Sequence, residues 1–135
     1  MSDLFLLDSN IILRVLIEDD KVQLNKIKKL LHSDKNFYLH DVIVSEVIWV
    51  AVKFYKVDKE TVINAITNLI ELPNLFCDKD RILEALNIWN SSTKLSFVDS
   101  YLLASSSIDK NDAVYTFDKG ILKTKVNGVN VLEPA

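Results

Sequence analysis

The stretch Leu4-Phe5-Leu6-Leu7-Asp8-Ser9-Asn10 decides how this chain is expected to fold. Four consecutive apolar residues lead into Asp8, and a helical apolar pattern starts at once with Ile11. A short, unbroken apolar run is typical of a strand that is buried on both faces of a parallel sheet. Asp8 is therefore predicted to lie where a central strand ends and a helix begins. In open α/β sheets, ligands bind at this edge, beyond the carboxyl ends of the strands.

The composition predicts one soluble globular domain over residues 1–135. Of the 135 residues, 49% are apolar and 26% are charged, which is ordinary for a protein with its own hydrophobic core. With two glycines and two prolines, the chain has neither a flexible linker nor a glycine-rich phosphate loop. Cys77 is the single cysteine, which excludes a disulfide framework and fits a reducing compartment, so a cytoplasmic protein is expected.

Neither a signal peptide nor a membrane span is predicted. The first apolar run lacks a basic leader, and the apolar segment 42–52 is too short to cross a bilayer and contains Glu46. The net charge of −3 argues against general electrostatic adhesion to nucleic acid. Four carboxylates bound to metal would leave the remaining surface close to neutral, so charge neither supports nor excludes a nucleic-acid substrate.

The apolar periodicity predicts strands that alternate with helices. Helix boundaries are marked by polar residues such as Asp41, a predicted N-cap, and by Pro73 after the fourth helix. This alternation, with apolar central strands, indicates an α/β fold with a parallel sheet and helices on both faces. Strands are expected at 4–7, 37–39, 75–77, 113–117 and 129–132, and helices at 9–17, 22–31, 42–55, 59–72, 79–89 and 96–108, with a short turn from 118 to 120.

Four carboxylates occupy similar positions in this predicted pattern. Asp8 and Asp118 each follow a strand, Glu46 lies in the first turns of the helix after the second strand, and Asp99 lies three residues after Ser96, which opens a helix. In a parallel sheet, residues that end strands or begin the following helices project from one common edge. All four carboxylates are therefore expected to meet there.

Each carboxylate also has a purely structural interpretation. Asp8 and Asp118 could be N-caps, worth about 0.5–2 kcal/mol each, and Ser96 with Asp99 matches a capping box. Glu46 could gain about 0.3–1 kcal/mol from a helix N-terminus. Two carboxylates about 5 Å apart, however, repel by about 3 kcal/mol at an effective dielectric near 20. A cluster therefore needs protons or cations, and oxygen ligands without clustered His or Cys select Mg²⁺ or Mn²⁺.

Other residues that carry chemistry are given structural roles. His32 and His40 lie apart, which gives little support to a zinc site or a histidine-based nuclease. Cys77 has no histidine or basic residue beside it, so a buried small side chain is predicted and not a nucleophile. Trp49 and Trp89 lie on apolar helical faces and are predicted to belong to the core and not to form base-stacking platforms.

These residues resemble the motifs of PIN-domain nucleases, and the length most resembles the VapC-type toxins of toxin–antitoxin pairs. The resemblance covers essentially the whole chain, with the motifs in the family's order. Many members carry a further acid just after the position of Asp118, where this chain has Lys119 and Gly120. The motifs are Asp8-Ser9-Asn10, Ser45-Glu46-Val47-Ile48-Trp49-Val50, Phe97-Val98-Asp99 with Leu103-Ala104, and Thr116-Phe117-Asp118-Lys119.

The resemblance implies a three-layer α/β/α sandwich whose central parallel sheet of about five strands has the order 3-2-1-4-5. It also implies Mg²⁺- or Mn²⁺-dependent cleavage of RNA, a homodimer, and a cognate antitoxin whose tail blocks the acidic pocket with a basic side chain. The residues expected to bind the metal are Asp8, Glu46, Asp99 and Asp118, with Asn10 and Thr116 as polar support; phosphate contacts are expected from Arg14, Lys53, Lys94 and Lys119.

Two other functions remain open at the level of sequence. In phosphoaspartate chemistry, as in receiver domains or haloacid-dehalogenase-like phosphatases, Asp8 would be the nucleophile. The phosphatases need a second aspartate two residues on, where this chain has Asn10, and the paired acids of a receiver are absent from the first strand end. The second alternative is a binding module on the same fold without catalysis, against which the retention of all four acids argues.

Overall fold

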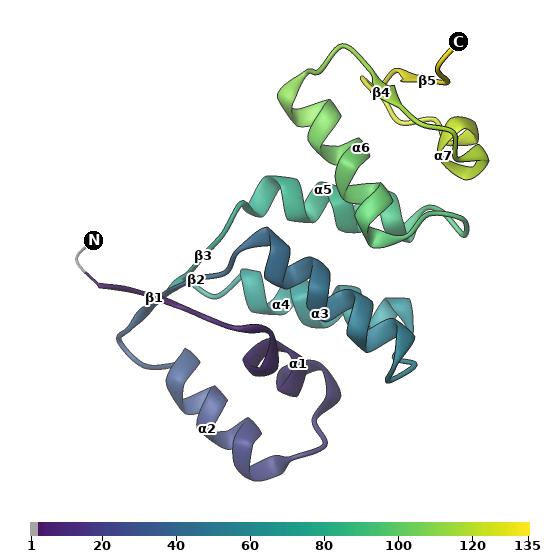
Figure 1. Cartoon of the computed structure of the whole chain (residues 1–135). Coiled ribbons are helices and arrows are strands. Elements are labelled where there is room, and N and C mark those ends of the chain that lie inside the picture. The colour runs from purple at the N-terminus through teal and green to yellow at the C-terminus, as the bar shows by residue number, and fades with distance from the viewer. Residues whose placement is uncertain (1–2) are drawn as a thin grey trace. The chain divides into compact units, whose positions relative to one another are not determined.

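The computed structural model describes residues 3–135, and the chain divides into two compact units (Figure 1). Unit 1 comprises Met1–Lys79 and unit 2 comprises Asp80–Ala135. Each unit contains parallel strands that are connected through helices, which is the pattern of an α/β fold. We describe the two units one after the other.

Unit 1 is built on a three-stranded parallel sheet in the order β1-β2-β3. In the register, Leu6 of β1 lies opposite Tyr38 of β2, and Phe37 lies opposite Leu75 of β3. The carboxyl ends of β1 and β2 therefore lie at the same edge of the sheet. The elements are β1 (Leu4–Leu6), α1 (Ser9–Ile17), α2 (Lys21–Leu31), β2 (Asn36–Tyr38), α3 (Asp41–Lys53), α4 (Lys59–Ile70) and β3 (Leu75–Phe76).

The core of unit 1 forms where helix α1 packs against α2, α3 and α4. The buried side chains of each helix recur every three or four residues, as an amphipathic helix requires. Burial of a large aliphatic side chain contributes about 1.5–3 kcal/mol, so this cluster dominates the stability of the unit. Its buried apolar residues include Ile12, Leu13, Leu16, Leu24, Ile27, Phe37, Leu39, Val44, Val47, Ile48, Val62, Ile66, Leu69 and Leu75.

Unit 2 pairs two parallel strands, with Val114 of β4 opposite Val131 of β5. Helices α5 and α6 are joined by an edge-to-face contact between Trp89 and Phe97, whose ring centroids lie 5.9 Å apart. Arg81 and Asp109 connect the same helices through two hydrogen bonds of 2.9 and 2.8 Å. The elements are α5 (Lys79–Asn90), α6 (Phe97–Asp109), β4 (Val114–Tyr115), α7 (Lys119–Lys123) and β5 (Val131–Leu132).

The predicted α/β class with parallel strands is confirmed. The sequence predicts one sheet with the strand order 3-2-1-4-5. The structure has two sheets: β3, β2 and β1 are neighbours in the sheet of unit 1, and β4 and β5 are neighbours in the sheet of unit 2. Element types agree with the prediction, and the boundaries differ by a few residues. In the part of the chain that the structure describes, residues 3–135, none of the helices combines the length and apolar character needed to cross a bilayer.

Two local predictions are wrong. The first strand is not buried on both faces, because β1 is an outer strand of its sheet and Leu4, Phe5 and Leu6 are exposed, whereas Leu7 is buried. Asp41 does not cap α3 either: it is the first residue of the helix, and His40 occupies the N-cap position without a side-chain capping bond.

Candidate metal-binding acids

Asp8 caps helix α1 immediately after strand β1. Its backbone is extended, and its Oδ1 atom accepts hydrogen bonds from the backbone N–H groups of Asn10 at 2.6 Å and Ile11 at 3.4 Å. The side chain is exposed, and within unit 1 it forms no ion pair among the described residues. The capping bonds thus fix the direction of the carboxylate, while its second oxygen stays available to a ligand.

Glu46 lies on the exposed face of α3, one and a half turns after the helix begins. Val44, Val47 and Ile48 face the core, and Glu46 has no hydrogen bond or ion pair with the described residues of unit 1. Asp8 follows the paired residue Leu6 by two positions, and α3 starts beyond the neighbouring strand end. Asp8 and the N-terminus of α3 therefore belong to the same edge of the sheet, and Glu46 lies about 7.5 Å further along the helix axis.

In unit 2, Asp118 follows strand β4 and caps the short helix α7. Its Oδ1 accepts a hydrogen bond of 3.0 Å from the backbone N–H of Ile121, and the Thr116 hydroxyl accepts one of 2.9 Å from the N–H of Asp118. A Cβ atom at Gly120 would lie 3.0 Å from Asp118 Oδ1 and 3.6 Å from the Cβ of Lys94. Glycine at this position therefore gives the Asp118 carboxylate the room that it needs.

Asp99 belongs to a complete capping box at the start of α6. The N–H of Asp99 donates to Ser96 Oγ at 3.1 Å, and the N–H of Ser96 donates to Asp99 Oδ2 at 3.2 Å. Both acids of unit 2 thus lie at starts of helices, and the closeness of Gly120 to Lys94 places the segment before α6 against the start of α7. As for Asp8, one carboxylate oxygen of Asp99 has a local hydrogen bond and the other has none.

These contacts suit a divalent cation with oxygen ligands. Asp8, Asp99 and Asp118 each bind a backbone N–H through one oxygen only, and Glu46 has both oxygens free of protein hydrogen bonds within its unit. Such carboxylates are the ligands that Mg²⁺ and Mn²⁺ prefer. Asp8 and Glu46 belong to unit 1, and Asp99 and Asp118 to unit 2. Within residues 3–135, no group of three or more His, Cys, Asp or Glu side chains is gathered closely enough to hold a metal ion.

The basic residues expected to contact phosphate differ in their present partners. Arg14 forms an ion pair with Asp19, and this hydrogen bond raises the pKa of Arg14 above its ordinary value. Lys119 lies 3.4 Å from a carboxylate oxygen of Glu133. Lys53 and Lys94 are exposed, and neither forms an ion pair within the described part of its own unit. The lysines at 53 and 94 are therefore the more accessible candidates.

Two side chains with possible reactivity have structural surroundings. Burial raises the pKa of the Cys77 thiol, and the nearby Asp41 carboxylate raises it further, so the thiol is protonated at neutral pH and is a poor nucleophile. The imidazole of His40 packs edge-on against the ring of Tyr38, with centroids 4.8 Å apart, at the N-cap of α3. The acids remain the candidates for chemistry.

The two tryptophans differ, although the sequence predicts that both belong to the core. Trp89 is 4% exposed, which confirms the prediction, and Trp49 is 53% exposed, so the prediction for it is wrong. Helix α3 is apolar on nearly all sides, and periodicity therefore cannot tell which of its faces is covered. Trp49 lies one turn after Glu46 on this helix. A charged residue on the same helical face is the sequence signal that could have indicated an exposed tryptophan.

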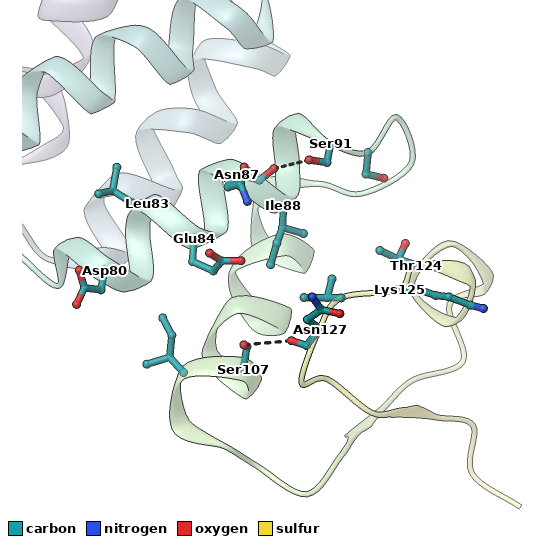
Figure 2. A pocket seen from close by; sticks show the side chains of 13 residues that line it. Asp80, Leu83, Glu84, Asn87, Ile88, Ser91, Ser107, Thr124, Lys125 and Asn127 are labelled. Carbon is teal, nitrogen blue, oxygen red and sulfur yellow. Dashed lines mark hydrogen bonds between the residues drawn. The ribbon is translucent and has the colours of Figure 1, made fainter.

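A cavity of about 920 Å³ lies within unit 2 (Figure 2). Helix α5 contributes Asp80, Glu84 and Asn87 to its lining, and the segment after α7 contributes Lys125 and Asn127. The hydroxyl of Ser107 donates a 3.4 Å hydrogen bond to the backbone carbonyl of Asn127. Neither Asp99 nor Asp118 lines this cavity, and no motif in the sequence predicts it.

Comparison with known proteins identifies the family. The model of the PIN domain family matches residues 5–127, which span both units and include all four acids. No curated protein matches the chain. Members of this family have a nuclease-type fold, and PIN nucleases act on nucleic acid, usually with a metal ion. The chain belongs to the PIN domain family.

Proposed function

We propose that this PIN domain is a Mg²⁺- or Mn²⁺-dependent ribonuclease and the VapC-type toxin of a toxin–antitoxin pair. One observation carries the proposal: Asp8, Asp99 and Asp118, at starts of helices, each use only one carboxylate oxygen in capping. Glu46 adds a fourth carboxylate without a protein partner in its unit. A chain of a nuclease-type family that keeps four such acids is suited to metal-assisted hydrolysis of phosphodiester bonds.

The roles proposed for the acids follow from their contacts. Asp8 and Asp99 would hold the ion, because capping bonds fix their carboxylates in direction and leave one oxygen of each available. Glu46 would accept a proton from the attacking water and orient it, since its carboxylate has no competing partner within unit 1. Asp118 would add negative charge to the same site, and Thr116 and Asn10 would position Asp118 and Asp8 through the backbone bonds described above.

A bound divalent ion would supply positive charge that lowers the pKa of the attacking water and offsets the charge of the phosphate. Lys53 and Lys94 would contact neighbouring phosphates, and Arg14 and Lys119 would do so by leaving Asp19 and Glu133. Replacement of a carboxylate partner by a phosphate costs little free energy, because surface ion pairs contribute at most about 1 kcal/mol.

The toxin role includes a homodimer, a cytoplasmic location and an antitoxin that inserts a basic side chain among the acids. A lysine or arginine would replace the positive charge of the ion, so inhibition by the antitoxin has an electrostatic basis. The order of the four motifs along the chain supports this part of the proposal. Growth arrest on expression, relieved by the protein of a neighbouring gene, is the expected result; normal growth at high expression would contradict the toxin role.

The test of the ribonuclease is cleavage of structured RNA with Mg²⁺ or Mn²⁺ by the full chain and by the Asp8→Asn and Asp99→Asn variants. Asp58→Asn is the matched control, because Asp58 caps α4 through the same kind of bond, 2.7 Å to the N–H of Thr61, outside the motifs. Cleavage that needs the metal, is lost in both variants and persists in the control supports the proposal. Acyl-phosphate formation at Asp8 would instead indicate a phosphoaspartate enzyme, and bound but intact RNA a binding module.

Binding of the ion can be measured without catalysis. Calorimetric titration of Mn²⁺ should show a site in the full chain that is weakened by a substitution in either unit, Asp8→Asn or Asp99→Asn. Retention of the same affinity in either variant would show that the acids of the two units do not share an ion, and the proposed roles would fail.

A further inference from the structure

The end of α3 and the residues that follow it present aromatic and basic side chains to solvent. Trp49 is 53% exposed, Phe54 67% and Tyr55 44%, and Lys53 and Lys56 are exposed beside them. We refer to these five residues as the aromatic–basic surface. Large exposed apolar side chains that are gathered in one place mark an interaction site more often than an accident of packing.

The surface is held in a defined shape. The rings of Trp49 and Phe54 meet edge to face, with centroids 5.3 Å apart and an interplanar angle of 76°, while half of the indole stays open to solvent. The chain turns at Lys56, which has a left-handed φ of +56°, and the N–H of Val57 donates to the carbonyl of Ala51 at 3.0 Å. Glu18 and Lys110 have the same left-handed backbone at the ends of α1 and α6, with φ of 58° and 55°, so the turn at Lys56 is of a kind that recurs in this chain.

The surface is continuous with one of the proposed catalytic acids. Glu46 and Trp49 are three residues apart on α3 and therefore lie on the same helical face, one turn from each other. Lys53 follows Trp49 by four residues and extends this face. A carboxylate, an indole and an ammonium group thus lie in a row along the exposed side of α3.

We infer that the aromatic–basic surface binds single-stranded RNA, with a base stacked on Trp49 and phosphates neutralised by Lys53 and Lys56. The inference rests on the proposed function and specifies its substrate: an unpaired segment, since only unstacked bases can reach an aromatic side chain. Aromatic platforms between cationic side chains are the general means of binding single strands. The row of residues on α3 would place the bound strand beside Glu46.

The charges at the surface favour RNA over a second copy of this chain. In a two-fold interface the same patch meets itself, so Lys53 and Lys56 would face their own copies, and lysine is depleted from the centre of protein interfaces. Two acids lie near the surface: Glu46, which is one turn before Trp49 and therefore on the side away from Lys53, and Asp58, which caps α4, where the positive end of the helix offsets its charge. The surface therefore attracts phosphate and opposes self-association.

Binding to a short, fluorescently labelled oligouridylate, measured by anisotropy with EDTA present so that no cleavage occurs, tests the inference. Trp49→Ala should weaken binding by roughly five- to hundredfold, the loss of one stacked base, and Trp49→Tyr should restore most of it. Lys53→Ala and Lys56→Ala should each reduce the slope of log K against log salt concentration by about 0.7 in magnitude, the value for one lost phosphate contact. Duplex RNA of the same length should respond little to Trp49→Ala.

Matched controls lie on α2, which carries an exposed valine and an exposed lysine. Val22→Ala and Lys29→Ala remove an exposed apolar and an exposed basic side chain without touching the surface. Sedimentation of every variant at the assay concentration reports its oligomeric state. Equal affinity in Trp49→Ala and Val22→Ala would overturn the inference, and so would a loss of binding that is accompanied by loss of a dimer.

Failure of the inference and failure of the proposed function give different results. If the full chain binds the oligonucleotide through Trp49 but does not cleave RNA with either metal, RNA binding by the aromatic–basic surface is supported and the proposed ribonuclease activity is contradicted. If the chain cleaves RNA and Trp49→Ala leaves both the affinity and KM unchanged, the ribonuclease stands and the surface has no role in substrate binding.

Discussion

The two units each supply one acid at the end of a strand and one acid on a helix, but they hold the helical acid differently. Asp8 and Asp118 both follow a strand and cap the next helix. Glu46 in unit 1 is exposed without a protein partner in its unit, whereas Asp99 in unit 2 belongs to a capping box. Acids with the same proposed chemistry can therefore have different structural roles. Substitution of the helical acid in unit 1 should reduce activity without reducing stability, whereas a change at the capping box in unit 2 should reduce stability.

The largest expected effect is on activity at Glu46. Glu46→Gln removes the charge but keeps the shape of a side chain that bonds to nothing in its unit, so RNA cleavage should fall by more than about a hundredfold while the unfolding temperature stays unchanged. Cleavage rates and thermal unfolding of the same preparation provide the measurement. Full activity of this variant would remove Glu46 from the proposed site.

Gly120→Ala should affect activity less. The added Cβ would lie 3.0 Å from Asp118 Oδ1, so the carboxylate must move by a few tenths of an ångström or lose its bond to the N–H of Ile121. Small displacements of this kind reduce cleavage by about tenfold, well below the effect of a lost acid. Gly128→Ala is not a suitable control because Gly128 has a φ of +78°; Asn111→Ala, at an exposed position between α6 and β4, provides the comparison. Unchanged kinetics would show that Asp118 does not need its present position.

The capping box gives the contrast in stability. Ser96→Ala leaves the Asp99 carboxylate in the chain but removes the hydroxyl that accepts from the N–H of Asp99, and should cost about 0.5–2 kcal/mol of unfolding free energy. Urea denaturation measures this loss. Ser45→Ala, within α3, is the partner experiment in unit 1: α3 has no side-chain capping bond, and no comparable loss is expected. Equal stability of the two variants would contradict the comparison between the units.

The smallest effect is expected at low pH in unit 2. The hydrogen bonds from Arg81 hold the pKa of Asp109 below its ordinary value of 3.8. The folded state therefore gains stability from this pair above pH 3.8 and loses it as the pH falls through the lower pKa of the folded state. Asp109→Asn should flatten the acid side of the stability curve, as followed by circular dichroism. An identical pH dependence in both proteins would show that the pair contributes nothing.

Much of the fold and of the candidate site could be predicted from sequence, because the signals are local. The run that ends at Asp8 and the strand that ends at Asp118 mark their own boundaries, and Ser96 with Asp99 forms the capping box that its spacing predicts. Residue type also limits the metal chemistry, since oxygen ligands without clustered His or Cys favour hard cations. Whether the four acids bind one ion stays a prediction.

Other features could not be predicted, because they depend on residues that are distant in sequence. The hydrophobic pattern of α3 does not say which side is covered, and the packing of α1 and α4 on it leaves Trp49 exposed. The exposed β1 strand follows from its place at the edge of the sheet. The closeness of Gly120 to Lys94, which brings the segment before α6 beside the start of α7, follows from the packing of two loops.

The sequence by itself thus determined the order of helices and strands and the four acids at their ends, since hydrophobic periodicity and capping act between residues a few positions apart. Only the tertiary structure decided which apolar side chains meet solvent and which basic residues are already paired. Burial and ion pairing depend on what the rest of the chain brings to a residue, and a single α-helix that is apolar on nearly every side leaves that choice to its neighbours.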